Sequence, residues 1–449
     1  MDDTLTGSIG RRGLLTGSAS LAAIALTPQT ASASLAAIAL TPQTASAAEG
    51  PESQRGAKKP ISAYPLVRAG TWSRGANLRD RAGRYQARQE HAAAVLNGFV
   101  YLIGGFVPIQ PPPAPTQDTP EPFMFAGTGE ILVYTPLGKA VSGVGVPGTW
   151  VSLPNSSSFP AGSMHHINAV AHRGKIWAFG GHAGPFSPTS HVYVFTPNSA
   201  SDPSGHWTQI KATDGKPCSP GVGCLDLPEA RSAGAAVSVG DRIYLIGGVV
   251  PTPNSPDPIN RSIGTTASVC YLDTTRFPLI WRRAPALRES REHFNAVYAD
   301  GRIWVFQGRN ERSTHLRGVE SLAVNHDGGW RKEQDAPFGA GANVLGRIGR
   351  RIYSFGGEFI ASNVTGTVTS SQFFSLDTRS WSRLETTKKK TPLDAAGADN
   401  KHGTYGVVIT EHGQDKILSP GGASTAWFDP MSKVHVFTPI ADAGPSGAI

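Results

Sequence analysis

Short apolar runs that end in a Gly-Gly pair recur along the chain at a regular interval. Aromatic and aliphatic residues fill each run, which is typical of a buried β-strand, and the glycines mark a turn. The copies lie at residues 101–105 (YLIGG), 177–181 (WAFGG), 244–248 (YLIGG), 353–357 (YSFGG) and 417–422 (ILSPGG), and a degenerate copy with Gln-Gly lies at 304–308 (WVFQG). The 317 residues from Gly105 to Gly422 make five steps of about 63 residues. A period of this length indicates a repeat architecture.

A tryptophan marks a second position in each repeat. Each one follows turn residues and opens a short strand of polar and apolar residues; the six are Trp72, Trp150, Trp207, Trp281, Trp330 and Trp381. In the first repeat we expect four strands: residues 91–96, the run that ends at Gly105, residues 131–135, and the strand at Trp150. Short strands separated by glycine and proline turns predict an all-β protein.

This order of strands resembles the kelch repeat, and the resemblance covers about residues 70–440. It implies a β-propeller, whose four-stranded blades stack around an axis because no blade buries its faces alone. The sixth repeat ends with its third strand, residues 434–437, and the Trp72 strand at the other end is left over. We therefore expect an all-β, six-bladed β-propeller of kelch repeats, closed by the N-terminal strand as the outer strand of the last blade.

Composition narrows the class of protein. Of 449 residues, only 16% are charged and 39% are apolar, which excludes a disordered chain and argues against long helices. The formal net charge is +8, but no motif that reads nucleic acid accompanies it, so we expect no nucleic-acid partner. Of the three cysteines, Cys218 and Cys224 flank a Pro/Gly turn and are expected to form a local disulfide.

The first 47 residues resemble a twin-arginine export signal. Arg11 and Arg12 precede a mildly apolar stretch, and residues 20–33 (SLAAIALTPQTASA) recur unchanged as residues 34–47. Each copy ends in Ala-Ser-Ala, so cleavage after Ala33 or after Ala47 stays open, as does an ordinary general-secretion signal. We expect a bacterial protein that is secreted or periplasmic, with a linker at residues 48–69 and a tail at 441–449. After signal cleavage we expect no membrane attachment, and we expect a monomer.

Imidazoles, cations and a carboxylate gather at the expected channel rim, where inner strands begin and second strands end. A structural hydrogen-bonding role for any single histidine stays open, since kelch repeats carry Arg and His there. Five residues are candidates for catalysis: His166, His293, His402, Tyr405 and Glu358. Six are candidates for binding an anionic substrate: His91, His182, Arg231, Arg291, Arg309 and Lys401.

A metal centre is the alternative use of these residues. Histidine and carboxylate ligands suit zinc or iron, and the candidate ligands are His91, His166, His293 and Glu358. We expect no cofactor, with a divalent metal as the alternative. A copper-radical site like that of galactose oxidase is less favoured, because it needs a Cys crosslinked to a Tyr of the pocket and Cys270 lies within an expected strand.

The function expected from the sequence is proton transfer beside a carboxylate. The substrate would be an anionic small molecule or polysaccharide derived from sugar acids, and the reaction that of a lyase, epimerase or mutarotase. Uronic-acid lyases and a kelch mutarotase of sialic acid offer a resemblance at the level of fold alone. A non-catalytic propeller that binds carbohydrate or protein is the rival interpretation, and a metal-dependent enzyme is the third.

Overall fold

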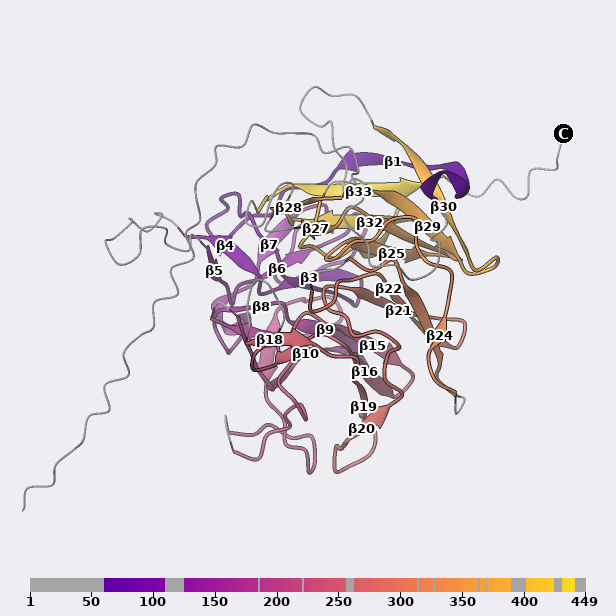
Figure 1. Cartoon of the computed structure of the whole chain (residues 1–449). Helices are drawn as coiled ribbons and strands as arrows, with labels where there is room; N and C mark the ends of the chain where they lie inside the picture. The colour runs from indigo at the N-terminus through magenta and orange to yellow at the C-terminus, as the bar shows by residue number, and fades with distance from the viewer. Residues whose placement is uncertain are drawn as a thin grey trace, which may run out of the picture. The chain divides into compact units, whose positions relative to one another are not determined.

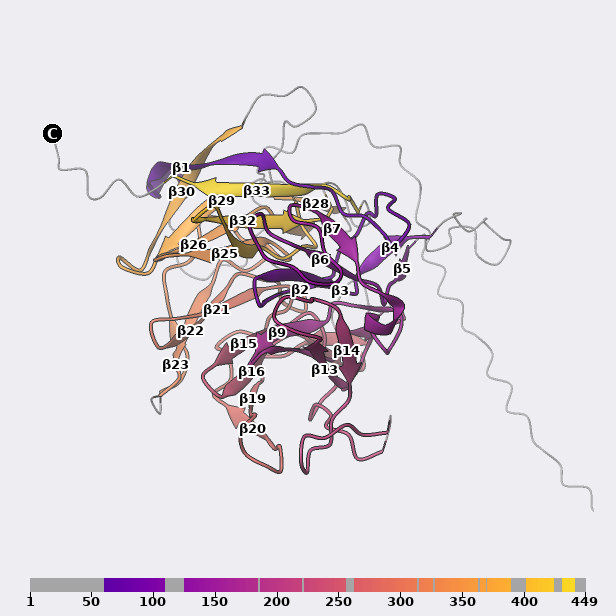
Figure 2. The same cartoon turned by 180° about the vertical axis from the view of Figure 1, so that it is seen from behind.

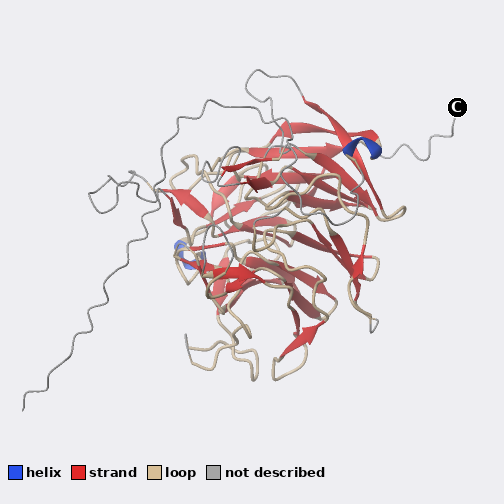
Figure 3. Cartoon of the chain, in the orientation of Figure 1, coloured by secondary structure: helices blue, strands red, loops and turns tan. Residues whose placement is uncertain are grey.

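The computed structural model describes residues 60–109, 125–184, 186–219, 222–255, 262–312, 315–325, 328–361, 364–368, 370–388, 401–423 and 430–440. The expected signal, most of the expected linker and the tail at 441–449 lie outside these residues. Strands joined by loops and turns make up the described part, and its two helices are single 3-10 turns, η1 (Ile61–Ala63) and η2 (Asn155–Ser157) (Figure 3). None of its helices has the length and apolar character needed to cross a membrane.

Four antiparallel sheets have four strands each. The first has the order β2 (Ala92–Leu96), β3 (Phe99–Ile103), β6 (Ile131–Tyr134), β7 (Trp150–Ser152). The second has the order β9 (Asn168–His172), β10 (Lys175–Phe179), β13 (Val192–Pro197), β14 (Gly205–Thr208). The third has the order β15 (Ala235–Val239), β16 (Arg242–Ile246), β19 (Val269–Asp273), β20 (Trp281–Ala284). The fourth has the order β21 (Asn295–Ala299), β22 (Arg302–Phe306), β23 (Val319–Ala323), β24 (Arg331–Lys332).

A fifth sheet of eight strands contains both ends of the repeat region. One half has the order β25 (Val344–Ile348), β26 (Arg351–Phe355), β29 (Ser371–Ser375), β30 (Ser380–Lys388). The other half has the order β1 (Leu66–Arg74), β33 (Val434–Pro439), β32 (Gln414–Pro420), β31 (Val407–Glu411). The N-terminal strand β1 pairs antiparallel with β33, as predicted, with Trp72 opposite Phe437. It also pairs parallel with β30, which the sequence did not predict, and both neighbours lie beside it in Figure 1 and Figure 2.

The loops between the main strands contain additional short strands. They form one three-stranded and three two-stranded sheets. These strands are β8 (Met164–His165), β11 (His182–Ala183) and β12 (Ser187–Pro188); β4 (Phe106–Pro108) and β5 (Phe125–Gly127); β17 (Val249–Pro251) and β18 (Ile263–Thr265); β27 (Glu358–Ala361) and β28 (Val364–Thr367). β8 lies just before the inner strand β9, and the other eight lie in the loops that join second strands to third strands, so the loops that carry several candidate residues are themselves hydrogen bonded.

Apolar side chains from consecutive sheets pack against each other. One core joins Tyr101 and Val133 of the first sheet to Ile176 of the second, and similar cores follow along the chain. The last core joins Leu102 of β3 to Leu418 of β32, so the end of the chain packs against its beginning. Burying both faces of each sheet in this way supplies the main driving force for folding.

The Gly-Gly pairs end the second strands because the backbone approaches the neighbouring loop closely. Gly180 has φ +58°, and a Cβ there would lie 1.8 Å from the carbonyl oxygen of Arg231. Only glycine fits such a contact in the left-handed region. The repeated glycines thus allow adjacent sheets to approach one another closely. The fold is a β-propeller of antiparallel sheets.

Candidate metal centre

Six backbone groups form a closed ring of hydrogen bonds. They belong to Glu90, His166, Ala233, His293, Ala342 and Gly403. The N–H of each donates to the carbonyl oxygen of the previous member, and Glu90 closes the ring on Gly403, with distances of 2.7–3.0 Å. All six adopt left-handed φ values, the non-glycine members between 49° and 54°. The ring favours the expected count of six blades, which stays a prediction.

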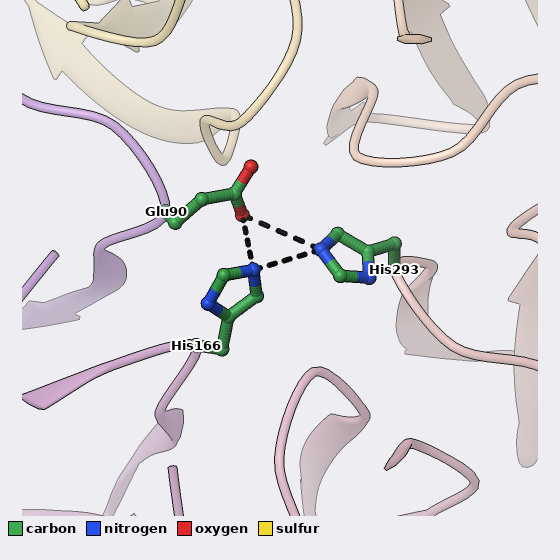
Figure 4. A group of neighbouring side chains, drawn as sticks. All are labelled: Glu90, His166 and His293. Atoms are coloured by element: carbon green, nitrogen blue, oxygen red, sulfur yellow. Dashed lines mark hydrogen bonds and ion pairs between the residues drawn. The ribbon is translucent and has the colours of Figure 1, made fainter. Parts of the chain in front are cut away.

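Three members of the ring carry large polar side chains, and these converge. Glu90 precedes β2, His166 lies between β8 and β9, and His293 precedes β21, and Figure 4 shows the three pointing toward one another. His166 Nε2 lies 2.9 Å from His293 Nε2 and 3.3 Å from Glu90 Oε2, which is 3.7 Å from His293 Nε2. All three are at least nine-tenths buried. Together they form a compact set of potential metal ligands.

The tautomer of His166 follows from its neighbour His165. His165 Nε2 lies 2.8 Å from the carbonyl oxygen of Gly184, which can only accept, so this nitrogen carries the proton. In a neutral ring His165 Nδ1 is then an acceptor, and it meets Nδ1 of His166. His166 must therefore donate from Nδ1, which leaves a lone pair on its Nε2.

The tautomer of His293 follows from Glu292. Nδ1 of His293 contacts Oε2 of Glu292, a carboxylate oxygen that accepts its proton. The other oxygen, Oε1 of Glu292, accepts from Nε of Arg309, and Nη1 of Arg309 donates to Oε1 of Glu358. His293, like His166, therefore directs an unprotonated Nε2 at the centre of the cluster.

Burial and neighbouring charges shift the pKa values of the cluster in different directions. Burial, followed by the nearby Glu358 charge, raises the pKa of Glu90 to about 8. Burial also tends to raise the pKa of Glu358, but Arg309 together with His402, His293 and His315 outweighs this effect and lowers it to about 2. The pKa values of His166 and His293 lie well below 6.5, chiefly because of burial, so both rings are neutral at pH 7. In the metal-free cluster, the proton on Glu90 faces the lone pair of His166.

Other residues predicted as catalytic lie around this centre but do not join it. Glu358 binds Arg309, and its Oε2 lies 3.5 Å from His402 Nδ1. Tyr405 follows Gly403 of the ring, and burial, with a smaller effect of Glu90, raises the pKa of its hydroxyl. His182, which was predicted to bind the substrate, lies with Nε2 2.9 Å from Ser232 Oγ, and burial lowers its pKa to about 3.

Three of the four cationic side chains that were predicted to bind the substrate lie outside the cluster. Arg231 donates to the carbonyl oxygens of Gly247 and Ser268, and Arg291 to those of Gln307 and Gly318. Lys401 Nζ similarly lies 2.9 Å from the carbonyl oxygen of Ser419. These buried cations satisfy carbonyl groups at the ends of the second and third strands. Part of their hydrogen-bonding capacity is therefore used within the protein, and the expectation that they bind a substrate stays a prediction.

His91 is also outside the cluster, contrary to its place among the predicted ligands. Its Nε2 lies 3.5 Å from Thr404 Oγ1. The residue that converges with His166 and His293 is Glu90, which the sequence reasoning missed. A signal for it existed: Glu90, His166 and His293 each stand two residues ahead of an inner strand, whereas His91 stands one residue ahead.

The cysteines follow the expected arrangement. Cys218 and Cys224 form a disulfide, with their Cα atoms 5.6 Å apart. Cys270 is free and buried within β19, and burial raises the pKa of its thiol. It pairs in register with Leu245 and Arg283, so it belongs to the sheet interior.

Comparison with known proteins agrees with this fold. No family model matches the chain. The chain is 24% identical over 394 residues to the Kelch-like protein terF of Aspergillus terreus, which covers 86% of this chain and 71% of the relative. The fold is that of a kelch-type propeller. The chain is also 22% identical over 345 residues to the Acyl-CoA-binding domain-containing protein 4 of Arabidopsis thaliana, covering 76% of this chain and 43% of that protein.

Proposed function

We propose that Glu90, His166 and His293 bind one divalent transition-metal ion, and that this propeller is a metal-dependent enzyme. The observation that carries the proposal is the pair of Nε2 atoms 2.9 Å apart, on two rings whose Nδ1 atoms are occupied by His165 and Glu292. Two lone pairs repel at this distance unless a cation lies against both. Neighbouring ligands of an octahedral ion, each about 2.1 Å from the metal, lie roughly 3 Å apart.

The charges of the cluster support a divalent ion. Glu90, Glu292 and Glu358 are buried carboxylates connected through the two histidines and Arg309. With the carboxylates ionised and the imidazoles neutral, one guanidinium against three carboxylates leaves two negative charges. A buried excess of this size needs a compensating cation. A divalent metal supplies it, and it would replace the proton that Glu90 holds in the metal-free cluster.

The type and number of the ligands favour a catalytic centre. Two histidines and one carboxylate on one side of an ion are the ligand set of non-haem Fe(II) enzymes, whereas structural zinc is held by four protein ligands. Three protein ligands leave coordination positions for water or substrate. The other members of the ring are Ala233, Ala342 and Gly403, whose side chains offer no fourth ligand.

The anionic sugar substrate, the export of the protein and its monomeric state remain predictions. The contacts of Arg231, Arg291 and Lys401 with main-chain carbonyls weaken the case for an anion clamp. A non-catalytic propeller is the alternative, and a protein that binds no metal would favour it.

Metal titration tests the proposal. The purified chain, stripped with a chelator, is titrated with Zn(II), and anaerobically with Fe(II). We expect one ion per chain, and loss of that binding in His166→Ala. The control is His172→Ala, since His172 is a buried histidine of β9 that bonds Ser238 and Thr274 away from the cluster. Absence of stoichiometric binding, or equal binding by His166→Ala, would refute the metal centre.

A further inference from the structure

We propose that Arg309 is a positioning residue for this centre, which holds Glu292 so that His293 presents a lone pair to the metal. The inference rests on the proposed function. Arg309 follows the Gln307-Gly308 turn, and its side chain is 13% exposed. The sequence reasoning assigned it to a substrate, but its contacts lie with two carboxylates of the protein.

The two oxygens of Glu292 have separate partners. Oε1 accepts from Arg309, while Oε2 accepts from Nδ1 of His293. The main chain fixes the same pair, because the N–H of Glu292 donates to the carbonyl of Arg309 at 2.9 Å and the reverse bond is 3.0 Å. Each oxygen of the Glu292 carboxylate is therefore held by a partner, and the group cannot rotate without breaking a contact.

Glu358 holds Arg309 from the next loop along the ring. Its Oε1 accepts from Nη1 of Arg309, and its backbone N–H donates to the carbonyl of Gly341 at 2.9 Å. Arg309 thus connects two loops of the rim, one beside β21 and one at β27. Arg291, by contrast, pairs with Glu320 and with carbonyl groups beside it, and it makes no contact with His293.

The chemical consequence concerns the proton of His293. A carboxylate that accepts from Nδ1 keeps the proton on that nitrogen and makes Nε2 a better ligand. Without Arg309, Oε1 of Glu292 loses its donor, and the carboxylate can turn away from His293. His293 can then carry its proton on Nε2, and in that tautomer it cannot bind the metal.

The test compares Co(II) binding by the full chain and its variants, each first stripped of metal. In Arg309→Met we expect about 10- to 100-fold weaker affinity and an altered visible spectrum of the bound Co(II). Arg309→Lys keeps the charge, and we expect it to restore part of the affinity. Arg231→Met is the control, because Arg231 is a buried arginine that donates to Gly247 and Ser268 and pairs with Glu229, away from the cluster. It should bind Co(II) like the wild type.

Wild-type binding separates the two proposals. If the wild type takes up no Co(II), both the metal centre and the positioning role of Arg309 fail. If it binds Co(II) and the folded Arg309→Met variant matches it in affinity and spectrum, the positioning role alone is wrong. An equal loss in Arg231→Met would also overturn it. Should Arg309→Met not fold, Glu292→Gln is measured instead, and an unchanged spectrum there rejects the proposal.

Discussion

His166 and His293 precede the inner strands of different sheets, yet their Nε2 atoms lie 2.9 Å apart. Their outer nitrogens are committed, to His165 in one case and to Glu292 in the other. The contacts with His165 and Glu292 therefore decide what His166 and His293 can bind. This arrangement is suited to a cation, and the carboxylate of Glu90 would be its third ligand.

Metal affinity should depend on the protonation of Glu90. The pKa of Glu90 is raised to about 8, so below that pH the ion must displace a proton from its carboxyl group. Affinity for Zn(II) should rise about tenfold per pH unit from pH 6 to 8 and then level off. Calorimetric titration in buffers of different ionisation enthalpy should detect about one proton released at pH 6.5. An affinity that stays constant from pH 6 to 9 would contradict this prediction.

Gly403→Ala should weaken metal binding although it touches no ligand nitrogen. Gly403 has φ +63°, and a Cβ there would lie 2.6 Å from Oε1 of Glu90, so the carboxylate must move. Gly413→Ala is the control, since Gly413 has φ +73° and no atom within 4 Å of the added Cβ. Both variants carry a backbone cost of roughly 1 kcal/mol. Only Gly403→Ala should lower Zn(II) affinity, and an equal affinity for both would reject the steric argument.

The N-terminal strand should contribute strongly to stability. The ring of Trp72 lies 4.8 Å from that of Phe355 and 5.3 Å from that of Phe437, so it packs against both halves of the eight-stranded sheet. Trp72→Ala should lower the free energy of unfolding by about 3–5 kcal/mol. Denaturant titration followed by circular dichroism measures it, with the exposed Ser73→Ala as control. Equal midpoints for the two variants would show that closure by β1 is unimportant.

Acid should weaken the contact between the first sheet and the last. Glu411 of β31 accepts from the hydroxyl of Tyr134 at 2.7 Å and from the N–H of Leu137 at 3.1 Å. Burial opposes its ionisation, but these bonds and Lys416 lower its pKa below the usual 4.5. The stabilisation is therefore complete above about pH 4.5 and disappears as the pH falls through the lowered pKa.

Glu411→Gln measures this contribution. We expect it to destabilise the protein by about 1–3 kcal/mol at pH 7. The difference from the wild type should shrink in acid, and denaturant titration at both pH values checks it. A difference that stays constant down to pH 3 would mean that the charge of Glu411 contributes nothing.

The repeated residues predicted the fold because they are needed for packing, and each sheet packs against its neighbours in the same way. The Gly-Gly pairs and tryptophans are required by close backbone contacts and by the cores between sheets. The unpaired Trp72 strand likewise predicted the pairing of β1 with β33. The parallel pairing of β1 with β30 was missed, because it arises between neighbouring outer strands and leaves no mark in the repeat.

The site was predicted only in part, because the sequence does not give the orientation and hydrogen-bond partners of individual side chains. The sequence prediction began the first inner strand at His91, whereas the strand begins at Ala92, and so it overlooked Glu90, which holds the position equivalent to His166 and His293. The donors of Arg231 and Arg291 were assigned to a ligand because the sequence does not show which carbonyl groups the Gly-Gly turns leave unpaired. His166 and His293 were correctly brought together because they occupy equivalent positions in their repeats.

Anomalous X-ray diffraction at the zinc absorption edge, from crystals of the chain loaded with Zn(II), tests the metal centre most directly. The proposal predicts one strong peak about 2.0–2.2 Å from Nε2 of His166, Nε2 of His293 and a carboxylate oxygen of Glu90. The peak should vanish in His166→Ala and persist in His172→Ala. Zinc bound elsewhere, with no peak between these three side chains, would contradict it.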